Sequence, residues 1–245
     1  MAGAIQIHLD QVTSTNDVAK EFLRDVDRVV VTADHQTSGR GRRGRDWYDA
    51  PGQSVLFSFG FRNESDRPTR DLAADMARGC LAVMATLRLY GHADQFRCKY
   101  PNDVQGRDVN GWSKLAGILV EHEFVGSHCQ STIIGIGINV LQESFPETIG
   151  QPTTSLMRLG ISREPKQVAS DLRTNIEHFQ MIDVDRVYSH WREELKVGHR
   201  VLKLPEDDSL WQMIDVDEIG RLVVMNNGDK TKRIIDNGDS IRYVD

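Results

Sequence analysis

The sequence has few cysteines and lacks any apolar run long enough to cross a bilayer. Its three cysteines are Cys80, Cys98 and Cys129, which form no CxxC pair and cannot all be joined to one another. Reduced thiols in the cytoplasm are therefore expected. No apolar segment approaches the roughly 18–20 residues that a membrane-spanning helix needs. Residues 1–8 have no basic region followed by an apolar core, so no secretory signal and no membrane association are expected.

The sequence also lacks the motifs of several large enzyme classes. There is no GxSxG, no GxxxxGK[ST] and no HExxH, and no Cys or His pair has zinc spacing. His122 stands between two glutamates, but no further ligand follows at a metal-binding interval. The GxG at Gly135 lacks a third glycine and opens no helix, which excludes a Rossmann site. The motifs assign no covalent nucleophile and no metal ligand.

The chain is negatively charged overall, yet one loop concentrates positive charge. The formal net charge is −6, yet residues 39–45 contain four arginines and three glycines. Glycine lets a backbone approach a ligand closely, and the arginine guanidinium matches phosphate or carboxylate. This pattern predicts an anion site, although a solvated loop or a short nucleic-acid contact has the same composition. Trp47 follows at once and favours a small-molecule pocket, because an indole can support a flat ring.

Hydrophobic periodicity predicts an α+β protein. Helices are expected to start at Ser14 and to cover 68–90 and 162–195, and strands to cover 27–33, 54–61, 96–100, 114–124 and 131–140. Ser14 and Asp17 have the spacing of a capping box. The last 50 residues change character, with short strands at 201–202, 210–216, 221–225, 233–235 and 241–244 between turn signals such as 205–209 and 237–239. We therefore predict a large domain over residues 1–195 and a small β-barrel over 196–245.

Four more groups of residues could take part in chemistry. Residues 99–103 end a strand with a proline turn and a carboxylate, which is also the signature of a simple Asx turn. Lys114 heads an apolar strand and could neutralise an anion, or it could face solvent. The strand at 133–139 contains glycines that could form one bare wall of a pocket. Ser14–Asn16 and Gln36 offer hydroxyl and amide groups for a polar head group, or merely cap a helix.

Taken together and in order, these segments resemble the biotin protein ligase family. The matching stretches are 14–16, Gln36 with 39–47, 99–103, 114–121, 135–139 and 154–156. The resemblance implies a core like that of class II aminoacyl-tRNA synthetases, a mixed β-sheet flanked by helices, with a small SH3-like C-terminal domain. It also implies that ATP activates biotin to biotinyl-5′-AMP, and that biotin is then transferred to a lysine of a biotin carboxyl carrier domain. Magnesium is implied as well, without assigned ligands.

The resemblance assigns roles to individual residues. The catalytic group comprises Lys114, Arg40, Arg42 and Asp103. The biotin site comprises Ser14, Thr15, Asn16, Gln36, Arg40, Gly41, Arg42, Lys114, Gly117, Gly135 and Gly137. The ATP and adenylate site comprises Arg42, Arg43, Arg45, Trp47, Asn102, Lys114 and Asn139. Because the adenylate hydrolyses in water, we expect residues 39–46 to be mobile without ligand and to order over it.

The chain departs from the family pattern in three places. Tyr100 replaces the usual tryptophan, residues 104–113 form a longer connection than in some members, and no N-terminal helix-turn-helix is expected. A DNA-binding repressor role is therefore not expected, while a homodimer is compatible with the sequence. The alternatives are a lipoate ligase of the same fold, a nucleic-acid-binding module that uses the arginine loop, and a biotin-binding sensor that no longer ligates.

Overall fold

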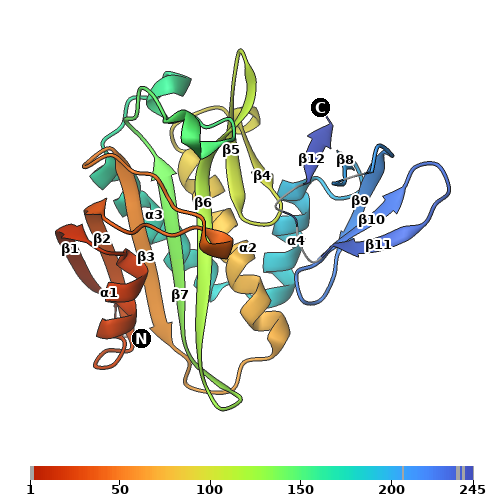
Figure 1. Ribbon diagram of the computed structural model, residues 1–245. Helices are drawn as coiled ribbons and strands as arrows, with labels where there is room; N and C mark the ends of the chain where they lie inside the picture. The colour runs from red at the N-terminus through yellow and green to blue at the C-terminus, as the bar shows by residue number, and fades with distance from the viewer. Residues whose placement is uncertain (1–2, 206, 236–237, 239–240, 245) are drawn as a thin grey trace.

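The computed structural model describes residues 3–205, 207–235, 238 and 241–244, arranged as two β-sheets with four α-helices (Figure 1). The larger sheet has seven strands in the order β1-β2-β3-β7-β6-β5-β4. Its strands are β1 (Ile5–Val12), β2 (Arg28–Gln36), β3 (Ser54–Arg62), β4 (Phe96–Lys99), β5 (Asp103–Asp108), β6 (Gly111–Val125) and β7 (His128–Asn139). β1 runs parallel to β2 and every other neighbouring pair is antiparallel, which confirms the expected mixed sheet.

Helices cover the two faces of this sheet unequally. The helices are α1 (Thr15–Phe22), α2 (Thr69–Leu87), α3 (Pro165–Met181) and α4 (Val184–Leu195), with short 3₁₀ turns at Arg42–Gly44, Ala93–Gln95, Glu147–Ile149 and Met157–Leu159. α2 and α3 lie behind the sheet, while α1 packs on its front (Figure 1). Side chains alternate between faces along a strand, so Val29 and Val31 pack in the cluster around α1 and Val30 packs in the main core.

The helical region predicted over 162–195 consists of two helices, α3 and α4. The first helix ends at Met181, Ile182 is extended, and Asp183 caps the second helix by accepting a bond from Arg186 N at 3.0 Å. An aspartate at this position satisfies a backbone N–H that a helix start leaves open, which explains the break. Arg78 on α2 donates to the carbonyl of Ile182 at 3.4 Å and so holds the junction against the core.

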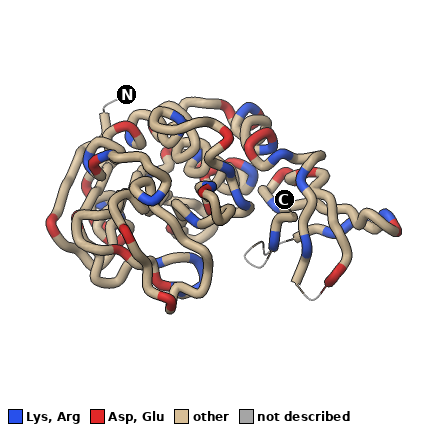
Figure 2. Tube along the Cα trace, turned by 90° about the horizontal axis from the view of Figure 1, so that it is seen from above, with Lys and Arg blue, Asp and Glu red and all other residues tan. Residues whose placement is uncertain are grey.

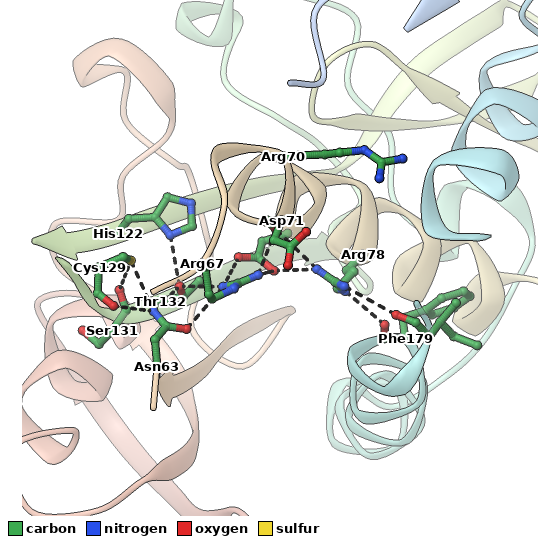
Figure 3. Close-up of polar contacts among 12 residues, drawn as sticks. Asn63, Arg67, Arg70, Asp71, Arg78, His122, Cys129, Ser131, Thr132 and Phe179 are labelled. Carbon is green, nitrogen blue, oxygen red and sulfur yellow. Dashed lines mark hydrogen bonds and ion pairs between the residues drawn. The ribbon is translucent and has the colours of Figure 1, made fainter. Parts of the chain in front are cut away.

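A buried ionic network anchors α2 (Figure 3). Asp75 is fully buried and lies 2.8 Å from Arg67 Nη1 and 3.0 Å from Arg78 Nη1. Arg67 also reaches Thr132 Oγ1 at the start of β7, and Arg78 reaches the carbonyl of Phe179. Removing one partner from such a network costs about 3–5 kcal/mol because a buried charge is left uncompensated. The network therefore fixes the sheet, α2 and the α3–α4 junction relative to one another.

The smaller sheet follows α4 in the chain and lies beside α4 and β4 (Figure 1). Its order is β11-β10-β9-β8-β12, with β8 (Val201–Lys203), β9 (Trp211–Val216), β10 (Leu222–Asn226), β11 (Lys232–Ile235) and β12 (Arg242–Val244), all antiparallel. Five short strands were expected here, and that prediction is confirmed. The expected turns at 205–209 and 237–239 include residues outside the described ranges. The domain boundary at 195–196 falls between α4 and β8 and stays a prediction.

The structure tests two local predictions, the capping box at Ser14 and the connection formed by residues 104–113. Ser14 is the N-cap residue of α1, but its side chain makes no capping hydrogen bond, so the capping box is wrong; Asp17 binds Arg40 instead. Residues 104–113 form the β5–β6 hairpin, whose strands are part of the seven-stranded sheet. All three cysteines are buried and free. No helix in the described part of the chain is long and apolar enough to span a membrane.

Candidate active site

A cleft of about 1330 Å³ lies on the sheet face that carries α1. Single ligand pockets are usually about 300–1,000 Å³, so this cleft has room for two small molecules together. Its walls come from the start of α1, residues 36–49, the turn at 99–103, the centres of β6 and β7, and residues 148–153. Ile241 and Arg242 of the smaller sheet close one side.

The floor of the cleft is a row of glycines across neighbouring strands. Gly137 of β7 pairs with Gly117 of β6, and Gly117 pairs with Asp103 of β5. A Cβ at Gly137 would lie 2.4 Å from the Trp47 indole, and one at Gly117 would lie 2.9 Å from it. The prediction that this bare backbone forms one wall of a pocket is confirmed, and in this structure Trp47 lies against it. The Trp47 Nε1 is buried without a hydrogen-bond partner. The indole therefore packs on the glycines without a hydrogen bond from its ring.

One end of the cleft is lined by a polar network around the start of α1. Gln36 Oε1 accepts from Thr15 N at 2.8 Å and from Thr15 Oγ1 at 3.1 Å. Asn16 Nδ2 donates to Glu121 at 2.6 Å. The Ser58 hydroxyl oxygen lies 2.7 Å from Thr15 Oγ1 and 2.6 Å from Asn16 Oδ1. The arrangement presents several donors and acceptors whose orientations are fixed by one another, as recognition of a polar head group requires.

Ser58 and Glu121 belong to this network, and the sequence analysis assigned neither of them to the site. Ser58 is a fully buried hydroxyl in β3, directly paired with Gly135. A polar residue at an inward position of an otherwise apolar strand was the available signal. Gly135 itself admits Asn16, because a Cβ there would lie 2.3 Å from Asn16 Oδ1.

The arginine loop folds back on itself beside α1. The backbones of Arg40 and Asp46 form an isolated antiparallel β-bridge, and Gly41 N donates to Arg45 O at 2.6 Å. The Arg40 guanidinium binds both carboxylate oxygens of Asp17, at 2.7 and 2.6 Å, and comes within 3.6 Å of Glu121. The hydrogen bond from Arg40 lowers the pKa of Asp17, and the same bond raises the pKa of Arg40. Arg40 thus faces α1 rather than the centre of the cleft.

The remaining motifs meet at the other end of the cleft. Arg42 donates to Asn102 Oδ1 at 3.2 Å, and the Lys114 ammonium lies 2.8 Å from the Asp103 carboxylate. The Asn102 Nδ2 donates to Ile118 O at 2.9 Å, which ties the turn to β6. The loop, the proline turn and the lysine strand therefore converge although they are far apart in sequence.

Residues 152–154 hold the backbone of Lys114 in place. Lys114 N donates to Pro152 O at 2.8 Å, and Thr154 N donates to Lys114 O at 2.8 Å. Asn139, predicted at the nucleotide site, donates its side-chain amide to Thr154 O at 3.0 Å. Its polar group therefore supports the segment that carries Lys114.

The structure gathers the predicted site residues with one exception. The cleft is lined by Ser14, Thr15, Asn16, Gln36, Arg40, Gly41, Arg42, Arg45, Trp47, Asn102, Asp103, Lys114, Gly117, Gly135, Gly137 and Asn139. Arg43 is absent from this lining; it is exposed, in the left-handed region at φ 58°. The hypothesis that arginines and a lysine from distant segments share one cleft is confirmed, while the individual roles stay predictions.

Three carboxylates line the cleft, those of Asp46, Asp49 and Asp103. Asp103 and the Asn102 carbonyl oxygen lie where a phosphate-bound magnesium ion could be held, and such ions commonly need one or two carboxylates. Within the described ranges, three side chains with convergent ligand atoms occur at His8, Asp10 and Asp34, and none of them lines the cleft.

Charges of both signs alternate along the described part of the chain. Figure 2 shows Lys and Arg interspersed with Asp and Glu along the trace. A nucleic-acid-binding surface normally needs clustered positive charge, and two of the four loop arginines, Arg40 and Arg42, engage Asp17 and Asn102. The geometry therefore favours small anionic ligands over a nucleic acid.

Comparison with known proteins agrees with this geometry. Residues 9–139 match the model of the biotin/lipoate A/B protein ligase family. The chain is 32% identical over 241 residues to a biotin–[acetyl-CoA-carboxylase] ligase of Mycobacterium tuberculosis, covering 90% of this chain and 84% of the relative. It is 31% identical over 177 residues to the bifunctional ligase/repressor BirA of Escherichia coli, covering 70% of this chain and 53% of that protein.

Solved structures show the same likeness over the whole fold. The biotin protein ligase from Aquifex aeolicus, in complex with biotin and ATP, superposes with a TM-score of 0.71 at 27% identity. The match covers 98% of this chain and 99% of that one. Both sheets are therefore part of the likeness.

Proposed function

Because the chain belongs to the biotin/lipoate A/B protein ligase family, we propose that its cleft joins biotin to AMP and passes the biotin to a protein lysine. The acceptor is a biotin carboxyl carrier domain of a biotin-dependent carboxylase, and the site of action is the cytoplasm. The observation that carries the proposal is the convergence of Arg42, Asn102, Asp103 and Lys114 in a cleft large enough for two ligands.

The polar end of the cleft receives the ureido ring of biotin. Thr15 and Asn16 line the cleft and offer hydroxyl and amide groups, which the buried Ser58 hydroxyl holds in position. In the present arrangement these groups bond one another, so binding exchanges internal hydrogen bonds for bonds to the ring. The Trp47 indole, which lies on the glycine floor, gives the fused rings a flat apolar surface.

In the first step a carboxylate oxygen of biotin attacks the α-phosphorus of ATP, and pyrophosphate leaves. Both reactants are anions, so the barrier contains a large electrostatic term. The Lys114 ammonium and the Arg42 guanidinium act on charge that grows in the transition state, the arrangement that contributes most to rate. Magnesium, when bound, neutralises phosphate charge, with Asp103 and Asn102 as the residues placed to hold it.

In the second step the lysine amine of the carrier attacks the acyl carbon of the adenylate, and AMP leaves. The attacking amine must lose a proton, and the Asp103 carboxylate is positioned to accept it or to orient the amine. Residues 39–46 cover the adenylate until the carrier arrives, because water would hydrolyse it.

Incorporation of labelled biotin into a carrier domain, with ATP and magnesium supplied, tests the proposal. We expect time-dependent labelling together with biotin-dependent pyrophosphate exchange. A lipoate ligase would show exchange with lipoate in place of biotin. A nucleic-acid module would show salt-sensitive binding to DNA or RNA and no exchange.

A further inference from the structure

Tyr100 inserts its side chain from the larger sheet into the smaller one. The residue is 4% exposed, and its hydroxyl donates to Gly220 O at 3.1 Å and accepts from Leu222 N at 3.2 Å. Gly220 and Leu222 belong to the β9–β10 turn and the start of β10. A Cβ at Gly238 would lie 2.4 Å from the Tyr100 ring, so the smaller sheet also closes tightly around the ring.

A second tyrosine holds the backbone at the same point. The Tyr100 amide donates to the hydroxyl of Tyr243 on β12 at 2.9 Å. Arg97 and Arg200 lie 5.2 and 4.7 Å from the Tyr243 ring centroid, within range of cation–π attraction. Burial raises the pKa of Tyr243, so the phenol stays neutral. The smaller sheet therefore fixes both the side chain and the main chain of Tyr100.

The residues immediately after Tyr100 hold the charged groups of the cleft. Asn102, two positions on, accepts from Arg42 at 3.2 Å. Asp103, three positions on, lies 2.8 Å from the Lys114 ammonium. The smaller sheet therefore binds the turn at Tyr100. Two and three residues further on, the same turn contacts Arg42 and Lys114.

We propose that Tyr100 is a positioning residue through which the smaller sheet sets the placement of Lys114 and Arg42. The inference rests on the proposed function, since it concerns the geometry of that reaction. A misplacement of about 1 Å can cost on the order of 10²-fold in rate. Removing the Tyr100 hydroxyl leaves the buried Leu222 N–H without this partner and frees the turn to shift.

Pyrophosphate exchange by the full-length chain tests the inference with Tyr100→Phe. We expect kcat to fall on the order of tenfold while the KM for biotin stays within twofold, because the shift affects transition-state contacts rather than ring binding.

Tyr188→Phe is the matched control. The Tyr188 hydroxyl lies 3.2 Å from Arg70 O and 3.4 Å from Glu218 O, so it meets the same β9–β10 turn. Both partners of this hydroxyl lie outside the turn at residues 100–103. We expect this variant to lose thermal stability as Tyr100→Phe does and to keep kcat within twofold.

Two further variants separate positioning from a general loss of structure. Tyr243→Phe removes the acceptor of the Tyr100 amide and should lower kcat in the same way. If Tyr100→Phe does not fold, this variant is used to test the inference. In a Lys114→Ala background, Tyr100→Phe should lower the rate by clearly less than tenfold, because one of the two groups that it positions is gone.

The outcomes distinguish the inference from the proposed function. If the parent protein shows no biotin-dependent exchange, the proposed function fails. If the parent is active and Tyr100→Phe keeps its kcat within twofold, the positioning role is overturned. The role is also overturned if Tyr188→Phe lowers kcat as much, or if the Lys114→Ala background leaves the full tenfold effect.

Discussion

The Lys114 ammonium lies 2.8 Å from the Asp103 carboxylate, joining two motifs that come from neighbouring strands. Neither side chain is more than a fifth exposed, so the pair is shielded from solvent screening. A ligand anion in the cleft would compete with Asp103 for the ammonium. Asp103 therefore compensates the charge of the Lys114 ammonium as long as no ligand anion is bound in the cleft.

Replacement of Lys114 by alanine should slow adenylate formation by about 10²–10³-fold, the usual loss for one transition-state contact. The fold should remain, because the ammonium is not part of the core. Pyrophosphate exchange and the thermal midpoint measure the two effects. Lys166→Ala, on the solvent-exposed part of α3, is the control. Exchange by Lys114→Ala at the rate of the parent would remove the lysine from the mechanism.

Asp103→Asn should slow transfer to the carrier more than it slows adenylate formation. An amide cannot take the proton of the incoming amine, and proton transfer by a positioned group contributes about 10²–10⁴-fold. Single-turnover transfer from preformed adenylate measures the step. Asp108→Asn in the same strand, whose carboxylate caps the turn at Asn110, is the control. Equal losses in both steps would argue against a role specific to transfer.

The arginine loop should become resistant to trypsin when biotin and ATP are present together. Arg43 and Arg45 are exposed, so they are accessible in the absence of ligand, and an ordered loop would hide them. Mass spectrometry of the fragments measures cleavage within 39–46. Equal cleavage rates with and without the substrates would show that the loop does not close over them.

Gly137→Ala should weaken biotin binding and destabilise the fold. Its Cβ would lie 2.4 Å from the Trp47 indole, so the ring must move, and overpacking of this kind typically costs about 1–3 kcal/mol. The KM for biotin and the thermal midpoint should both change. Gly3→Ala, with open space around the added atom, is the control. An unchanged KM would mean that the glycine floor is not in contact with the ligand.

Stability should fall as the pH drops below about 6.5, in part because of His122. Burial lowers the pKa of His122 below its ordinary value of 6.5. His122 then binds a proton more readily in the unfolded chain than in the folded one. Its contribution to the free energy of unfolding is therefore complete above pH 6.5 and is lost as the pH falls through the folded pKa. Denaturant unfolding between pH 7.5 and 5.5 measures the slope. His122→Gln should flatten it, and an unchanged slope would assign the effect to other groups.

Much of the fold was predictable because its signals are local. The apolar run at 133–139 and the turn-separated strands after residue 200 depend on alternation and on turn residues, and both were predicted correctly. The α3–α4 break was missed because apolar spacing continues across it, while the capping by Asp183 acts at a single residue. The Ser14 capping box failed since Asp17 has a stronger partner in Arg40, 23 residues away.

The sequence by itself determined which charged and glycine-rich segments this protein has, because composition and spacing are properties of the chain. Only the tertiary structure decided that Lys114 meets Asp103, that Trp47 lies on Gly137, and that Tyr100 reaches the second sheet. The physical reason is that strand order and register set these distances. A seven-stranded sheet in the order found here places β5, β6 and β7 side by side, and no local pattern encodes that adjacency.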